Sequence, residues 1–174
     1  MNQHTTTLLQ ASLETALGSM LVIADDNALY LVDFIDDSKL EQKVKRLKKQ
    51  LNATIITGRT PVIDLFEQEL MLYSAGRLQL FKTPVVLLGT PFQQKVWQAL
   101  QKIPFGQTCS YAQLAQVVGK TTAWRAVAQA NSANRLPIII PCHRVINTNG
   151  ALGGYSSGLA RKVWLLKHEK ESAS

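Results

Sequence analysis

The sequence predicts an α/β protein in two parts, a small α/β domain over residues 1–88 and a mainly helical domain over residues 89–174. Three observations favour this division. The first third of the chain consists of short apolar or alternating runs between turn-like residues, which is typical of strands. The second half shows the apolar spacing of amphipathic helices. The balance of charged residues also changes between the two parts, and 174 residues suit one large domain or two small ones.

The N-terminal part is expected to begin with an antiparallel meander. Its three strands are separated by turn-like sequences and are predicted at residues 8–13, 20–24 and 29–34. Ser38 is expected to cap an amphipathic helix that carries Leu40 and Leu47 on its apolar face. A further strand is possible at residues 53–56, and Pro61 opens a second helix that ends near residue 76.

The C-terminal part is expected to contain a helix-turn-helix. Thr90 and Pro91 form a helix start, and Ser110 caps a short helix over residues 111–118. A glycine turn then leads into a second short helix over residues 122–131. Two short helices joined by a tight turn that contains glycine are typical of helix-turn-helix motifs.

The remainder of this part is expected to hold a strand, a loop and a last helix. Residues 137–145 read as an apolar strand that leads into Cys142. A polar, glycine-rich loop follows over residues 147–155. The last helix begins at Gly158 and ends near Glu169.

Positive charge is concentrated in the second part. Residues 1–84 hold nine Lys/Arg and ten Asp/Glu, whereas residues 85–174 hold ten Lys/Arg and two acids. No acidic residue lies between Glu69 and Glu169. A basic half of this kind is typical of proteins that bind polyanions, most often nucleic acid. The alternative is that the charge only promotes solubility.

Cys142, His143 and Arg144 are consecutive and follow Pro141. A thiolate is the reactive form of cysteine, and neighbouring basic groups favour it. Successive side chains of a strand point to opposite faces, so Cys142 and His143 can cooperate only if the backbone turns there. Pro141 is a suitable place for such a turn because it has no N–H. The alternative is a structural cysteine at the end of a core strand.

Several classes of protein are disfavoured by composition. No apolar stretch is long enough to cross a bilayer, and the first residues lack the pattern of a secretory signal, so we expect no membrane association. Two cysteines do not form a disulfide framework, which favours a reducing, cytoplasmic setting. The three histidines form no ligand pattern with the cysteines, so we expect no metal and no cofactor.

Residues 90–169 resemble the O6-alkylguanine-DNA alkyltransferases, which are DNA repair proteins that are consumed by their own reaction. The resemblance rests on the Pro-Cys-His-Arg-Val motif at residues 141–145 and on the sequences around it. These are Ser110-Tyr111, Trp124-Arg125-Ala126-Val127, Asn134, Gly153-Gly154-Tyr155-Ser156, Lys162 and the run from Trp164 to Glu169. The first ninety residues match only in length and in strand-rich character.

The resemblance implies a fold and an acceptor site. The fold would be a ribonuclease H-like N-terminal domain followed by a winged helix-turn-helix domain. Cys142 would accept the alkyl group from O6 of guanine, and His143, linked through a water to Glu169, would take the thiol proton. Asn134 would hold the turn at Cys142 by hydrogen bonding. Each protein molecule would act once and irreversibly.

The resemblance also implies how DNA is bound. Arg125 would enter the duplex in place of an everted nucleotide, and Tyr111 would push its phosphate and lie beside its base. Thr122 and Ala126 would lie on the DNA-binding helix. The guanine edge would be read by Val145, Tyr155, Ser156 and Lys162. The expected partner is double-stranded DNA that contains O6-alkylguanine, with O4-alkylthymine as a further candidate lesion, and the protein is expected to act as a monomer.

Two other functions are also compatible with a cysteine next to a histidine in a basic half of the chain. A winged-helix module could bind alkylated DNA without transfer, although such proteins lack the thiol that Cys142 supplies. A cysteine hydrolase could use Cys142 and His143, but the histidine of such enzymes usually lies far from the cysteine in sequence.

Overall fold

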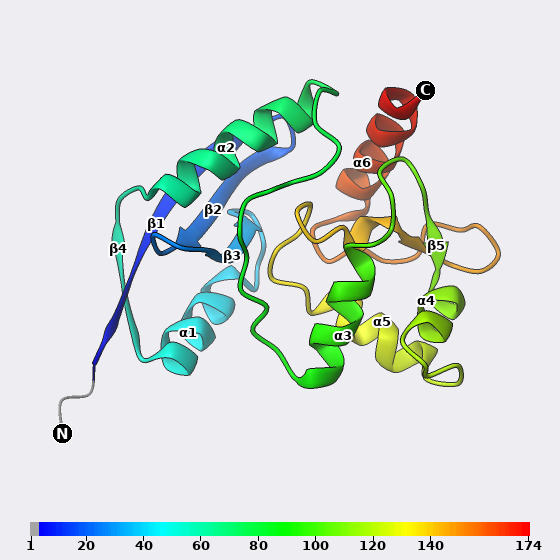
Figure 1. Cartoon of the computed structure of the whole chain (residues 1–174), viewed down its shortest axis with the longest axis horizontal. Coiled ribbons are helices and arrows are strands. Elements are labelled where there is room, and N and C mark those ends of the chain that lie inside the picture. The colour runs from blue at the N-terminus through cyan, green and yellow to red at the C-terminus, as the bar shows by residue number, and fades with distance from the viewer. Residues whose placement is uncertain (1–3) are drawn as a thin grey trace. The chain divides into compact units, whose positions relative to one another are not determined.

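The computed structural model describes residues 4–174, and the chain divides into two compact units, Met1–Val86 and Leu87–Ser174 (Figure 1). The first unit contains a mixed sheet and two helices, and the second is mainly helical. The predicted α/β class is therefore confirmed. Among residues 4–174, no helix combines the length and the apolar character that spanning a membrane requires.

The first unit is built on a four-stranded sheet with the order β3-β2-β1-β4. Strands β1 (Thr6–Thr15), β2 (Gly18–Ala24) and β3 (Leu29–Phe34) form the expected antiparallel meander. Strand β4 (Ala53–Thr57) pairs in parallel with β1 at one edge of the sheet. Completely buried aliphatic side chains of the meander, Leu8, Val22 and Leu31 among them, form the core of this unit.

Two helices connect to and pack on this sheet. Helix α1 (Leu40–Leu51) packs on β3 and β4, and helix α2 (Pro61–Ser74) packs on β1 and β2. The prediction that Ser38 caps α1 is wrong. Lys39 is the N-cap residue, and its side chain makes no capping hydrogen bond. The side-chain acceptor before the helix is Asp37 rather than Ser38, because Asp37 Oδ1 accepts from the N–H of Lys39 (2.8 Å).

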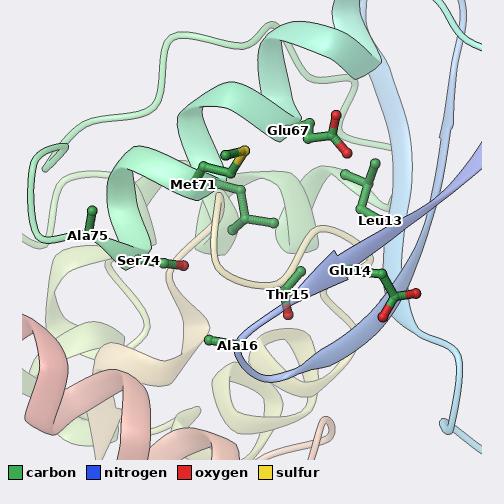
Figure 2. A pocket seen from close by; sticks show the side chains of 9 residues that line it. Leu13, Glu14, Thr15, Ala16, Glu67, Met71, Ser74 and Ala75 are labelled. Carbon is green, nitrogen blue, oxygen red and sulfur yellow. The ribbon is translucent and has the colours of Figure 1, made fainter.

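A mostly apolar pocket opens in the first unit between α2 and the turn that joins β1 to β2. Its volume is about 470 Å³. Figure 2 shows Met71 and Leu13 in its wall, with the carboxylates of Glu14 and Glu67 beside them. None of its lining residues is a candidate site residue.

The second unit contains four α-helices. They are α3 (Pro91–Leu100), α4 (Tyr111–Val117), α5 (Trp124–Ser132) and α6 (Leu159–Ala173). Thr90 and Ser110 cap α3 and α4, as predicted, and each also forms a capping box with the glutamine three residues later. Helix α6 continues past Glu169 to Ala173, so the prediction that it ends near Glu169 is wrong.

Helices α4 and α5 are joined by a short turn, as expected for a helix-turn-helix. Gly119 ends α4 with a φ of +74°, a left-handed conformation that favours glycine. Helix α5 begins at Trp124 rather than Thr122, because the N–H of Ala123 donates to Lys120 O (2.8 Å) and closes a turn over the intervening residues. Thr122 therefore lies in the connecting turn and not on the helix.

The predicted strand over residues 137–145 is not present. Pro137 and Pro141 have no N–H to donate, and Ile138 adopts a φ of +74°, so this run folds into tight turns. Cys142–Arg144 form a 3₁₀ turn, η1, and only Val145–Ile146 (β6) are extended. Strand β6 pairs in parallel with β5 (Cys109–Ser110). The backbone thus turns at Cys142, which is the condition for Cys142 and His143 to share one site.

Candidate active site

The η1 turn holds Cys142 in the interior of the second unit, with 2% of its surface exposed. Two asparagines fix the backbone around it. Asn134 Nδ2 donates to Ile140 O (2.9 Å), as expected for a residue that holds this turn. Asn131 Nδ2, from the last turn of α5, donates to Cys142 O (3.3 Å). Sequence reasoning found Asn134 but missed Asn131, which sits among small residues with no distinguishing signal.

His143 contacts Glu169 directly. Its Nε2 lies 2.8 Å from Glu169 Oε1, and both side chains are buried. The expectation of a water between them is wrong, because η1 and α6 pack close enough for a direct hydrogen bond. Among the described residues, His143 Nδ1 is a buried nitrogen that has no hydrogen-bond partner in the protein.

Arg144 completes a buried charge cluster that the sequence did not reveal. Its Nε donates to Glu169 Oε2 (2.9 Å) and its Nη2 to Glu169 Oε1 (2.8 Å), so the pair is bidentate. Its Nη1 donates to Ile103 O (2.6 Å). The only sequence signal was the position of Arg144 directly after His143, in a half of the chain with two acids.

These contacts set the protonation of the cluster. Burial opposes ionisation of Glu169, but hydrogen bonds from His143 and Arg144 lower its pKa to about 2. Burial lowers the pKa of His143 more than Glu169 raises it. The imidazole is therefore neutral at neutral pH, and because the Glu169 carboxylate can only accept, Nε2 carries the hydrogen. Nδ1 is left with a lone pair that can accept a proton.

Lys162 is completely buried on α6 and binds three carbonyl oxygens. Its Nζ donates to Val145 O (2.7 Å), Leu152 O (2.5 Å) and Gly154 O (3.1 Å). All three hydrogens of the ammonium group are thereby used. Lys162 ties β6 to the glycine-rich loop, and no N–H of this group is left to donate to a ligand.

The loop between β6 and α6 lies against Tyr111. A Cβ on Gly153 would stand 3.4 Å from Tyr111 Cε2 and 3.1 Å from Asn147 Oδ1, and its φ of +70° favours glycine. Tyr155 is half-buried on this loop, whereas Ser156 is exposed. Burial raises the pKa of Tyr111, the Cys142 side chain raises it further, and a hydrogen bond with Asn131 lowers it. Tyr111, Cys142 and Asn131 are therefore neighbours.

The start of α5 is exposed. Thr122, Arg125 and Ala126 all lie on the surface there. Trp124 is also half exposed, and the Arg125 guanidinium carbon lies 5.2 Å from the centroid of its ring, within cation–π range. The structure thus gathers Cys142, His143, Glu169 and Asn134 in one buried cluster, and presents Thr122, Arg125 and Ala126 at a separate exposed helix start.

No group of three or more His, Cys, Asp or Glu side chains that could hold a metal ion occurs within residues 4–174.

Comparisons with known proteins agree on one family. Residues 91–171 match the model for "6-O-methylguanine DNA methyltransferase, DNA binding domain". The constitutive methylated-DNA–protein-cysteine methyltransferase of Bacillus subtilis is 38% identical, over 99% of this chain and 98% of its own length. A relative of the same name from Shigella flexneri is 39% identical, over 93% and 95%. The structure of Mycobacterium tuberculosis OGT in complex with DNA matches with a TM-score of 0.80 and 32% identity, over 96% and 94%.

Proposed function

The chain belongs to the methylated-DNA–protein-cysteine methyltransferase family, and from this premise we propose that it repairs DNA by moving an alkyl group from O6 of guanine to its own Cys142. It is a DNA repair methyltransferase whose partner is DNA. The observation that carries the assignment of Cys142 is the buried chain of contacts in which His143 links the η1 turn to Glu169 (2.8 Å).

The reaction proceeds as one displacement. The Cys142 thiol gives its proton, through an intervening water, to the free lone pair of His143 Nδ1, and Glu169 stabilises the imidazolium. The thiolate attacks the alkyl carbon, the S–C bond forms, and the C–O6 bond breaks with its electron pair going to the purine. The proton that His143 accepted is returned through solvent to N1, which restores guanine and neutral His143. The thioether formed on Cys142 is far more stable than the alkyl–oxygen bond that breaks, so each molecule acts once, and the reaction needs no cofactor.

A buried thiol can reach O6 only if the nucleotide leaves the base stack. Everting a base from duplex DNA costs about a few kcal/mol. Arg125, exposed at the start of α5, fills the vacated space, and Tyr111 lies beside the everted base. Thr122 and Ala126 contact the backbone around the lesion, which adds affinity independent of sequence.

The guanine edge meets the backbone of Val145 and Ser156 and the side chain of Tyr155. Because Lys162 binds three carbonyl oxygens, its role in this site is to hold Val145 and the loop in place rather than to contact the base directly. Asn134 holds the η1 turn. The preferred lesion is O6-alkylguanine, with O4-alkylthymine as a further substrate.

The architecture fits this role. We propose a ribonuclease H-like domain over residues 1–88, which the sheet order β3-β2-β1-β4 supports, and a winged helix-turn-helix domain over residues 89–174, supported by α4, α5 and the pair β5–β6. The first domain is structural. The protein acts as a monomer in the cytoplasm, with one acceptor thiol per chain.

Mass spectrometry of the protein after incubation with a duplex that contains one O6-methylguanine tests the proposal. We expect a stable gain of one methyl group per chain. Tight binding of the duplex without a mass gain would instead show a binding module, and cleavage of an ester or amide substrate with turnover would show a hydrolase. Either result would contradict the assignment of Cys142 as acceptor.

A further inference from the structure

Asn131 occupies a position that the reaction described above does not use. It lies in the last turn of α5 with 4% of its surface exposed. Its side chain stands next to Cys142 and Tyr111, the acceptor thiol and the side chain placed beside the base. A buried amide at this point is close to the reacting atoms without belonging to the charge cluster of Glu169.

The amide of Asn131 is half satisfied. Nδ2 donates to Cys142 O (3.3 Å) and lies within reach of the Tyr111 hydroxyl. Oδ1 is buried and, among the described residues, has no hydrogen-bond partner. Exchanging the two atoms would place Oδ1 against the carbonyl oxygen of Cys142, which is unfavourable, so the Cys142 carbonyl fixes the orientation of the amide. A buried acceptor without a donor is costly and calls for a partner.

The chemistry of the substrate limits what that partner is. In O6-alkylguanine within DNA, the alkyl group removes the hydrogen from N1, N9 bears the sugar, and N3, N7 and O6 only accept. The two hydrogens of the 2-amino group are the only donors that remain on the base. Among the groups of an everted O6-alkylguanine, only the 2-amino group can therefore donate to a buried acceptor such as Asn131 Oδ1.

We propose that Asn131 is a specificity-determining residue, whose Oδ1 accepts a hydrogen bond from the 2-amino group of the everted base. The inference rests on the proposed alkyl transfer to Cys142. This contact explains why an asparagine is buried at this position, although an apolar side chain in its place would have no polar atom without a partner. Its donor half holds the Cys142 carbonyl, and its acceptor half selects a 2-aminopurine.

The test compares single-turnover transfer from duplexes that contain O6-methylguanine or O6-methylhypoxanthine, which lacks only the 2-amino group. We expect the wild type to prefer the guanine, and Asn131→Leu and Asn131→Ala to lose roughly fivefold of that preference, the value of one net hydrogen bond. Any difference in intrinsic reactivity between the substrates is common to all variants, so the change in the ratio isolates the contact.

Asn134→Leu is the matched control. This buried amide has both halves satisfied, by Ile140 O and by the N–H of Leu136 (3.0 Å), so its loss should slow both substrates by the same factor. The inference is overturned if the Asn131 variants slow both substrates equally, or if the wild type does not distinguish them. A wild type that methylates no cysteine with either substrate would instead contradict the proposed transfer itself.

Discussion

The two units of this chain bury charged side chains for different purposes. In the first unit, Glu69 accepts from the N–H groups of Lys82 (2.6 Å) and Thr83 (2.7 Å) and from the Thr83 hydroxyl, which fixes a segment after α2. In the second unit, Glu169 and its partners meet at the turn that carries Cys142. Buried carboxylates alone therefore do not indicate chemistry. What distinguishes Glu169 is a titratable partner with a free lone pair beside a thiol.

The pockets differ in the same way. The first-unit pocket between α2 and the β1–β2 turn is lined mainly by apolar side chains such as Leu13, Leu70 and Met71, and its lining contains no cysteine or histidine (Figure 2). The candidate site of the second unit is closed, with Cys142 and His143 almost completely buried. The pocket lined by Leu13 and Met71 is thus not where the reactive groups lie.

Replacing Cys142 gives the largest expected effect. Cys142→Ala should abolish methyl transfer completely, because no other residue takes the role of acceptor, while binding of duplex DNA is retained. A gel-shift assay and a transfer assay on the same preparation check both expectations. Residual transfer by this variant would move the acceptor role elsewhere, with Cys109 as the other cysteine in the chain.

Glu169→Gln should slow transfer by roughly a hundredfold, because the imidazolium of His143 loses its counter-charge. It should also lower the free energy of unfolding by about 3–5 kcal/mol, since Arg144 stays buried without an anion. Glu171→Gln is the control on the same helix, as Glu171 is exposed and 3.9 Å from Lys167. Equal rates for the two variants would remove Glu169 from the mechanism.

The pH dependence of stability follows from the same cluster. The pKa of Glu169 is lowered to about 2. The carboxylate therefore contributes fully to the free energy of unfolding above its ordinary pKa of 4.5, and this contribution is lost as pH falls from 4.5 toward 2. The pKa of His143 is lowered from 6.5, so the unfolded chain gains a proton first and stability also declines as pH falls below 6.5. Urea unfolding between pH 7 and pH 2 should show both losses. Below pH 4.5, the free energy of unfolding of Glu169→Gln should change less with pH than that of Glu171→Gln.

Arg125→Ala should slow transfer from duplex DNA by roughly tenfold, because the space of the everted nucleotide is no longer filled. Transfer from a free O6-alkylguanine base should be unchanged, since no base pair has to be opened. Lys170→Ala removes the same charge from an exposed position on α6 and controls for general attraction to DNA. An equal reduction of the transfer rate on both substrates would contradict the insertion of Arg125 into the duplex.

Glu69→Gln should give the smallest effect on activity. It replaces an acceptor of three hydrogen bonds in the first unit and should lower the free energy of unfolding by about 1–3 kcal/mol. The transfer rate of the folded protein should not change. A lower transfer rate for fully folded Glu69→Gln protein would show that the first unit takes part in the reaction.

Local signals predicted much of the fold. The meander, the helix starts at Thr90 and Ser110, and the turn between α4 and α5 all follow from residues close together in sequence. The strand into Cys142 was wrong because an apolar run fits a strand or a buried turn equally well, and two prolines decided the outcome. The sequence pattern before α1 likewise did not show that Asp37, and not Ser38, would accept a backbone hydrogen bond at the start of this helix.

The site was less accessible to sequence reasoning than the fold. The resemblance named His143 and Glu169, but their direct contact spans 26 positions and depends on how α6 packs on η1. The bidentate role of Arg144, the three carbonyls bound by Lys162 and the unsatisfied oxygen of Asn131 are likewise consequences of packing. Residue types indicated a reactive site. Only the tertiary structure showed which polar atoms of the described residues have no hydrogen-bond partner.

Peptide mapping after transfer from a duplex with isotopically labelled O6-methylguanine tests whether Cys142 is the acceptor. We expect one labelled methyl group per chain, carried entirely by the peptide that contains Cys142. The peptide with Cys109, whose thiol pKa is raised by burial, should carry none. Label on Cys109, or more than one methyl group transferred per chain, would contradict the assignment of Cys142.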